Sequence, residues 1–233
     1  MSDVASPAEL VPLSPLGKAG YSRDPASYIC RIEIVTETNP LTWLSSRSEA
    51  NLCYWASREG DEETAASGIL VEVSQPAGTE TKPWIKQIDS HLRTAADGVR
   101  FYGGFRFDPA APTAPEWQTL GDYRFVVPRF EAFLRNGSTF LACNFLSAEH
   151  DRLPELMIEL QRMCPSHVPA SPRVLLHRDT DVPDRSRWTK LVHNAVGAIN
   201  DPTDPLRKVV IARRTEATSK SAFTPQALLS SMS

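Results

Sequence analysis

Alternating apolar and polar residues mark the first ordered part of the chain. Residues 27–36 alternate in this way, which is the pattern of a half-buried β-strand. Residues 52–58 predict a second strand that ends in a turn, and residues 65–74 predict a third. A short helix that docks an aromatic side chain is expected at residues 41–44. We therefore expect residues 27–74 to form an antiparallel meander.

Three later stretches show helical periodicity. Apolar residues recur at spacings of three and four positions in residues 83–96, 151–163 and 186–200. This spacing places them on one side of an α-helix, so each stretch predicts an amphipathic helix. Asp184 and Ser186 are the alternative N-caps of the last helix, because a side-chain oxygen there can accept a hydrogen bond from a free backbone N–H.

Further strands are expected in the middle of the chain. Residues 101–108, 123–129 and 138–145 are rich in aromatic and β-branched residues, and an Asn-Gly turn at 136–137 precedes the last of them. The charged stretch 166–184 predicts a connection or an edge hairpin. Together with the helices, these strands predict an α+β fold.

Two glycines between aromatic residues, Gly103 and Gly104, indicate either a backbone bend or a close approach to another segment. A packing bend and a ligand-facing bulge both fit these residues, and packing is the more common outcome. Tyr54, Trp55 and Arg58 pose the same choice between packing and the binding of a ring or an anion. We expect alanine to be tolerated poorly at Gly103 or Gly104.

Residues 206–214 are the most informative stretch of the chain. Their core, Val-Val-Ile-Ala, predicts a short buried strand because β-branched residues fit a pleated surface. Side chains alternate along a strand, so Lys208 shares a face with Val210 and Ala212. An ammonium group among such neighbours loses hydration and becomes able to act as a general base near neutral pH. The alternative is a strand-end lysine whose charged group stays in water.

The two ends of the chain define the expected domain organisation. Residues 1–26 contain four prolines without any periodicity, which predicts a flexible leader. Thr224 and Pro225 predict the N-cap and first turn of a helix that reaches Met232. Because this helix has only about two turns and no stop signal, we expect the chain to be truncated. The expected organisation is therefore a leader followed by an incomplete domain over 27–233.

Composition narrows the class of protein. Of the 233 residues, 41% are hydrophobic and 23% are charged, as in ordinary soluble globular proteins. No apolar run approaches the roughly 20 residues of a membrane span, and no secretion signal is present, so we expect a cytoplasmic protein without a membrane partner. The net charge of −3 argues against nucleic acid as a partner, although Arg207, Arg213, Arg214 and Lys220 flank the Lys208 segment.

Cysteine and histidine spacing favours neither a disulfide nor a metal site. Cys30, Cys53, Cys143 and Cys164 lie far apart without a CxxC or zinc pattern, so we expect reduced thiols in the core. The five histidines show no HxH or HxxxH spacing. No GxGxxG or GxxxxGK[ST] motif supports a nucleotide cofactor.

Taken in order, these segments resemble the N-terminal half of the chorismate-utilising enzymes, and most of all the isochorismate synthases. The likeness covers residues 28–230. The residues that carry it are Trp43-Leu44, Tyr54-Trp55-Ala56-Ser57-Arg58, the Gly68 strand, Phe101-Tyr102-Gly103-Gly104-Phe105-Arg106-Phe107, Trp117, Phe125-Val126-Val127-Pro128-Arg129, the Trp188 helix and Lys208-Val209-Val210-Ile211-Ala212-Arg213.

The resemblance implies a fold, a reaction and a role for one residue. The fold would be the α+β chorismate-binding fold, with two sheets in the middle and helices outside. The reaction would be the Mg²⁺-dependent conversion of chorismate to isochorismate, for menaquinone or siderophore biosynthesis, by a protein that is a monomer when complete. Lys208 would be the general base that deprotonates water for attack on the chorismate ring.

The family's catalytic acid and its magnesium ligands lie at later positions than Ser233. The resemblance therefore places the Mg²⁺ ligands in a missing C-terminal half, and we expect the 233-residue chain alone to be inactive. Salicylate, anthranilate and aminodeoxychorismate synthases use the same substrate and remain alternatives, although a lysine base favours water over ammonia as the nucleophile. A non-catalytic binding module is the alternative from a different class, and the absent acid and metal ligands support it.

Overall fold

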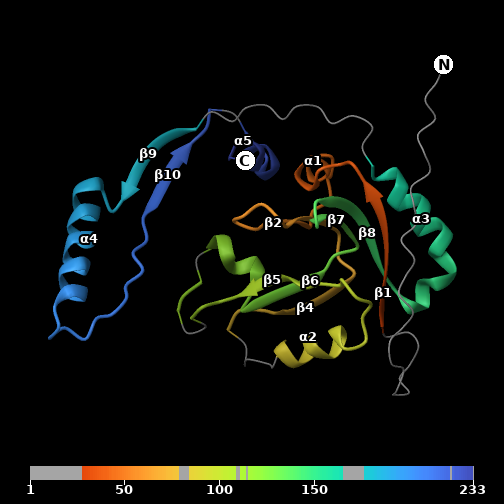
Figure 1. Cartoon of the computed structure of the whole chain (residues 1–233), viewed down its shortest axis with the longest axis horizontal. Coiled ribbons are helices and arrows are strands. Elements are labelled where there is room, and N and C mark those ends of the chain that lie inside the picture. The colour runs from red at the N-terminus through yellow and green to blue at the C-terminus, as the bar shows by residue number, and fades with distance from the viewer. Residues whose placement is uncertain are drawn as a thin grey trace. The chain divides into compact units, whose positions relative to one another are not determined.

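The computed structural model separates into two compact units, residues 1–169 and 170–233 (Figure 1). The expected leader at residues 1–26 lies outside the described residues. The single domain expected over 27–233 stays a prediction. The residues that the structure describes are 28–78, 84–108, 111–113, 115–164, 176–220 and 222–232.

In its described residues, unit 1 contains two antiparallel sheets flanked by helices. A five-stranded sheet has the strand order β1-β8-β7-β3-β2, and a three-stranded sheet has the order β4-β6-β5. The strands are β1 (Ile29–Thr36), β2 (Leu52–Ala56), β3 (Glu63–Ser67), β4 (Val71–Gln75), β5 (Tyr102–Phe105), β6 (Tyr123–Val127), β7 (Phe130–Arg135) and β8 (Ser138–Leu146). The helices are α1 (Pro40–Ser45), α2 (Trp84–Leu92) and α3 (Leu153–Arg162), with the 3-10 helices η2 (Pro115–Leu120) and η3 (Ser147–Arg152).

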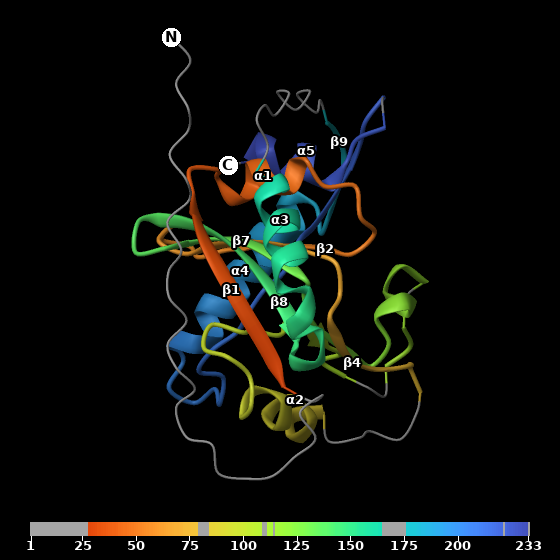
Figure 2. The ribbon, with the colours of Figure 1, turned by 90° about the vertical axis from the view of Figure 1, so that its right-hand side faces the viewer.

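One face of the five-stranded sheet is apolar. Ile34 on β1 lies beside Leu141 on β8. The same row continues through Ala132 on β7 to Ala65 on β3, and all four side chains are buried. Helix α1 packs against β3 and β7 and places Trp43 in the core, while α3 packs against β8 (Figure 2). These two helices therefore form the outer layer on this side of the sheet.

The three-stranded sheet lies on the other side of the five-stranded sheet, with α2 outside it (Figure 1). Trp84 of α2 stacks on Phe125 of β6 with ring centroids 4.7 Å apart. Ile29 of β1 and Val127 of β6 pack together with Val99, so one end of the space between the sheets is an apolar core. Two antiparallel sheets in the middle with helices outside agree with the predicted α+β fold class.

Local signals predicted several elements correctly. Helix α1 begins after Asn39, whose side chain accepts hydrogen bonds from the backbone N–H groups of Leu41 and Thr42 at 2.9 and 3.2 Å. The predicted turn at Asn136 and Gly137 connects β7 to β8. Both residues have positive φ angles, 52° and 76°, as a two-residue hairpin turn requires.

The meander expected over residues 27–74 is confirmed only for β2 and β3, which pair antiparallel, and it is wrong for β1, which pairs with β8 and not with β2. The single strand expected at 65–74 is two strands, β3 and β4, that belong to different sheets. Gly68 separates them with a φ of +73°, a left-handed conformation that ends the extended run. Strand β7 was not predicted, because Pro128 and Arg129 form a short corner through which the chain passes from β6 in one sheet to β7 in the other.

Unit 2 contains β9 (His177–Val182), α4 (Arg185–Asn200), β10 (Arg214–Thr218) and α5 (Pro225–Met232). Strand β9 lies in the stretch for which a connection or an edge hairpin was expected, and it pairs antiparallel with β10. Two predicted caps are confirmed. The Asp184 carboxylate accepts from the backbone N–H of Arg187 at 2.8 Å, and the Thr224 hydroxyl oxygen accepts from that of Ala227 at 3.2 Å.

Candidate functional site

Lys208, the site residue predicted from the sequence, lies in an extended segment between α4 and β10. Residues 205–213 form no strand, and the side chain of Lys208 is exposed. Val209 and Val210, which were expected on opposite buried faces, are 42% and 83% exposed. The expected buried strand at 206–214 is therefore wrong, apart from its last residue, with which β10 begins.

The reason lies in strand pairing. Strand β9 bonds to residues 214–218, so the segment before them has no neighbouring strand within the described part of unit 2. A β-branched sequence favours a strand only where a partner and a packing surface exist. The loss of hydration that was expected to make Lys208 a base is not provided by this arrangement, and its catalytic role stays a proposal.

A cluster of charged side chains that the sequence analysis missed lies on the face of the five-stranded sheet opposite α1 and α3. Arg31 of β1 is buried at its centre. Its Nη1 donates to Glu131 Oε2 at 2.5 Å and to Asn144 Oδ1 at 2.9 Å. Its Nε donates to Glu33 Oε1 at 2.7 Å. One guanidinium thus serves two carboxylates from two strands.

The segment that enters β5 covers this cluster. A Cβ atom built on Gly98 would lie only 3.3 Å from Arg31 Nε and 3.4 Å from Glu33 Oε1. Tyr102 of β5 is close enough to Glu131 for the two groups to interact electrostatically. Burial raises the pKa of the Tyr102 hydroxyl, and the negative charge of Glu131 raises it further. The cluster is therefore enclosed between the two sheets.

Glu131 is the most unusual member of the cluster. Its side chain is 1% exposed, and Oε1 has no hydrogen-bond partner among the described residues. Burial raises the pKa of Glu131, and the attraction of Arg31 offsets this only in part. Burial acts to lower the pKa of Arg31, but the carboxylates of Glu131 and Glu33 outweigh it, so that this pKa is raised.

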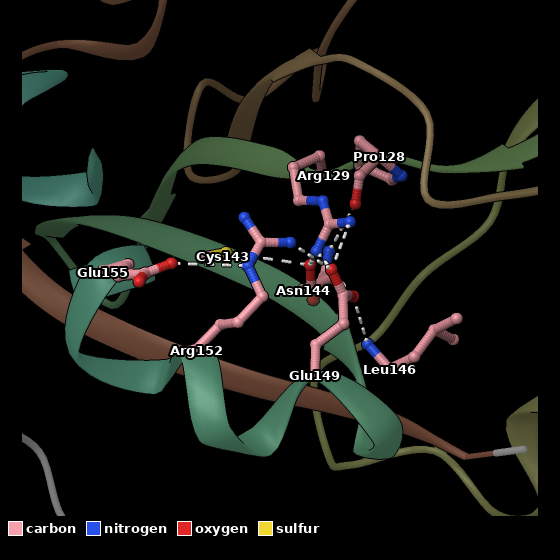
Figure 3. Close-up of polar contacts among 8 residues, drawn as sticks. All are labelled: Pro128, Arg129, Cys143, Asn144, Leu146, Glu149, Arg152 and Glu155. Carbon is pink, nitrogen blue, oxygen red and sulfur yellow. Dashed lines mark hydrogen bonds and ion pairs between the residues drawn. The ribbon is translucent and has the colours of Figure 1, made fainter. Parts of the chain in front are cut away.

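A second arginine–glutamate pair lies at the end of β8 (Figure 3). Arg129 donates from Nη1 to Glu149 Oε2 at 2.9 Å and from Nη2 to Oε1 at 3.0 Å. Glu149 also accepts from the backbone N–H of Leu146 at 3.0 Å and from Arg152 Nη1 at 3.2 Å. These bonds, with that to Arg129 first, hold the pKa of Glu149 below its usual range. This pair anchors η3 to the corner between the sheets.

A cavity of about 120 Å³ lies between the two sheets near the start of β2. Asn51, Cys53, Arg124 and Val126 are among the residues that line it. Arg124 Nη2 donates to Asn51 Oδ1 at 3.1 Å and to Glu72 Oε2 at 3.2 Å. The Arg124 guanidinium and the Asn51 amide of this cavity are therefore bonded to each other.

The two glycines of β5 differ in their surroundings. A Cβ atom on Gly103 would lie 1.9 Å from the carbonyl oxygen of Arg124 on the neighbouring strand, whereas one on Gly104 would meet nothing within 4 Å. The close approach expected at this pair is therefore found at Gly103. Tyr54 donates its hydroxyl to Glu63 Oε1 at 2.9 Å, which connects β2 to β3, while Trp55 remains 47% exposed.

Cysteines and metal ligands add no second site. The four cysteines are free, as predicted, but only Cys143 is fully buried, and burial raises the pKa of its thiol to about 12. Within the described ranges, no group of three or more His, Cys, Asp or Glu side chains is placed to hold a metal ion. No described helix is long and apolar enough to cross a membrane.

A sign of the buried cluster was present in the sequence. Arg31 and Glu33 occupy alternate positions of a strand, and the residues next to them are Cys30, Ile32 and Ile34, so both charged residues had to lie on one face. Polar positions of a half-buried strand usually face water, so the alternation alone does not indicate a buried cluster. Only the position of the second sheet reveals that it is covered.

Known proteins that are similar in sequence and structure indicate the family of this chain. The chain is 26% identical to the chloroplastic isochorismate synthase of Catharanthus roseus, over 88% of this chain and 43% of that protein. It is 27% identical to the isochorismate synthase of Escherichia coli, over 76% of this chain and 37% of that protein. The solved structure of the menaquinone-specific isochorismate synthase of Escherichia coli superposes with a TM-score of 0.55 at 21% identity, over 88% of this chain and 45% of that one.

The coverage and identity of these matches decide which features the chain shares with its relatives. The chain spans less than half the length of these relatives. The structural likeness establishes a shared fold. The chorismate binding enzyme family matches residues 18–233, which include both units and the Lys208 segment. With this match over most of its length, the chain belongs to the chorismate binding enzyme family.

Proposed function

We propose that this chain is part of an isochorismate synthase, which converts chorismate to isochorismate in the cytoplasm, with menaquinone biosynthesis as the pathway it serves. The observation that carries the proposal is the agreement among its relatives. Similar proteins from Catharanthus roseus, Arabidopsis thaliana and Escherichia coli all bear the name isochorismate synthase. The protein of solved structure is specific for menaquinone.

Lys208 is the general base of the proposed reaction. Its neutral amine accepts a proton from water, whose oxygen then attacks one carbon of the chorismate ring while hydroxide leaves from another. The leaving hydroxide needs an acid, to which no residue of this chain is assigned. The exposed position of Lys208 leaves its amine accessible to water and substrate.

Mg²⁺ belongs to the same proposal, because chorismate carries two carboxylates that a hard cation can hold. The described residues do not fit this ion, since they contain no group of acidic or other ligand side chains placed to bind it. We therefore assign no Mg²⁺ ligand among the described residues of this chain.

The test measures product identity and the role of Lys208 together. The protein is purified in the longest form that its gene encodes and incubated with chorismate and Mg²⁺, and the products are separated by chromatography. We expect isochorismate. Salicylate, or anthranilate when ammonia is supplied, would assign the chain to a different member of the family.

The Lys208→Ala variant should lower kcat by about 10²–10⁴-fold, the usual contribution of a general base. Its thermal midpoint should not change, because the side chain is exposed and forms no packing contact that folding requires. Lys220→Ala, a second exposed lysine from the same unit, is the matched control and should keep full activity. Normal turnover by the Lys208 variant would exclude it as the base.

A further inference from the structure

The space between the two sheets of unit 1 has an apolar end and a charged end. Sheets that stack face to face normally fill this space with apolar side chains. Ile29, Val99 and Val127 do so at one end. At the other end, Glu131 is buried, and its Oε1 has no hydrogen-bond partner among the residues that the structure describes. A buried polar group of this kind calls for a specific explanation.

Among the described residues, Arg31 is the buried cation that faces Glu131, and it is shared with a second carboxylate. From β1, Arg31 and Glu33 face Glu131, and from β8, Asn144 faces it without a charge. Arg135, which bonds to Glu33 at 2.9 Å, is 43% exposed, so much of its charge is screened by water. The enclosed part therefore holds one cation, Arg31, which bonds to both carboxylates, while Arg135 compensates Glu33 from the edge of the cluster.

The remaining described neighbours of Glu131 add no buried charge. Cys53 of β2 and Tyr102 of β5 are both neutral, because burial and the charge of Glu131 raise the pKa of each. Arg100 acts on Glu131 from a distance, but its own side chain lies at the surface. An ionised Glu131 would thus place between the sheets a carboxylate whose Oε1 has neither water nor a hydrogen-bond partner among the described residues, while its cation Arg31 is shared with Glu33.

We propose that the Glu33–Arg31–Glu131 cluster is a pH-sensitive joint between the two sheets of unit 1, which pack tightly while Glu131 holds a proton and loosen when it releases that proton. With the proton, the cluster is neutral overall and Oε1 carries no charge. Without the proton, Oε1 needs water, and water reaches it only if the sheets separate locally. The joint is independent of the proposed enzymatic activity.

The sign of the pH dependence follows from this arrangement. Above about pH 4.3 the glutamate of the unfolded chain is ionised, whereas Glu131 in the folded chain still binds its proton. The folded state then binds more protons than the unfolded state, so its stability falls as the pH rises. The loss ends once the pH exceeds the value at which folded Glu131 itself titrates.

A direct test follows the ¹³C signal of the Glu131 carboxyl group by NMR in the full chain during a pH titration, with the signal assigned through the backbone. We expect its midpoint above about 4.3, the value for an exposed glutamate, while that of Glu149 lies below it. A Glu131 midpoint at or below about 4.3 would overturn the proposal. This measurement needs no substitution and so does not depend on how any variant folds.

The mechanical part of the proposal is tested by urea denaturation from pH 5 upward. The unfolding equilibrium constant of the unmodified chain should rise by up to about tenfold per pH unit more than that of Glu131→Gln, whose amide cannot ionise. Glu149→Gln is the matched control and should keep the slope of the unmodified chain, since Glu149 titrates below this range. If the unfolding equilibrium constants of the unmodified chain and of Glu131→Gln changed equally with pH, Glu131 would not control the packing of the sheets.

Discussion

Arg31–Glu131 and Arg129–Glu149 are both arginine–glutamate pairs attached to the five-stranded sheet, and both contact Asn144. Their surroundings differ. Glu149 receives hydrogen bonds on both oxygens, from three groups in all, and its side chain is 18% exposed. Glu131 receives one on Oε2, and its Oε1 has none among the described residues.

The comparison shows that an arginine partner does not by itself decide the ionisation of a glutamate. Satisfied oxygens and access to water favour the charged form of Glu149, so its pKa is lowered. Burial disfavours the charged form of Glu131 more than Arg31 and the other neighbours favour it, so its pKa is raised. Glu149 therefore contributes most to stability at higher pH, whereas Glu131 contributes most at lower pH.

The largest effect should come from removing the shared cation of the buried pair. Arg31→Leu leaves Glu131, Glu33 and Asn144 without their common donor between the sheets. We expect a loss of about 3–5 kcal/mol in the free energy of unfolding, measured by urea denaturation. Arg93→Ala, at a fully exposed ion pair on the surface, should cause no measurable change.

The double variant Arg31→Leu with Glu131→Leu sharpens this result. Replacing a buried ion pair by apolar residues is often neutral, whereas removing one partner is costly. Most of the stability lost in the single variant should therefore return. If Arg31→Leu alone cost less than about 1 kcal/mol, the worth of one ordinary hydrogen bond, the cluster would not be as enclosed as described.

A smaller loss should follow from Gly103→Ala, which disturbs the cover of the buried pair and leaves Arg129–Glu149 intact. The added methyl group would meet the Arg124 carbonyl at 1.9 Å, so β5 must move away from β6 and Tyr102 must move with it. We expect about 3 kcal/mol by thermal or urea denaturation. Gly104→Ala has open space around its Cβ and should be neutral, and equal effects for both variants would contradict the assigned close approach.

The smallest loss of stability is expected at Arg129–Glu149, the more exposed of the two pairs. Glu149→Gln loses charge-assisted bonds to Arg129 and should cost about 1–2 kcal/mol at pH 7. Because the pKa of Glu149 is lowered in the folded chain, its contribution is present above about pH 4.3 and disappears as the pH falls through the folded value. Urea denaturation at pH 7 and in acid measures the loss of stability in Glu149→Gln with and without the charge of Glu149. An equal loss at both pH values would show that this charge does not stabilise the fold.

Elements defined by neighbouring residues were predictable. Asp184 and Thr224 cap α4 and α5 as predicted, because a cap depends on residues two or three positions away. Strand pairing was not predictable in the same way. The sequence around Gly68 is continuous in its pattern, and only the assignment of β3 and β4 to different sheets shows the break.

The candidate site depends even more on distant partners. Arg31 meets Glu131 across 100 positions of the sequence, and no local pattern encodes that contact. The Lys208 segment was wrongly predicted as a strand. Its apolar sequence favours one, but no pairing partner for it is found among the described residues. The lysine could be singled out only through resemblance to a family, because its surroundings in this structure do not distinguish it.

The tight turn at Asn136 and Gly137 has a consequence for the order in which the chain folds. Strands β7 and β8 are joined by two residues and can pair as soon as both are synthesised, with little loop entropy to overcome. Strand β1 leaves the ribosome much earlier, yet its partner is β8 at the far end of unit 1. Ile32 and Ile34 must therefore stay exposed until β8 is made, so the oldest strand of the sheet is among the last to be incorporated.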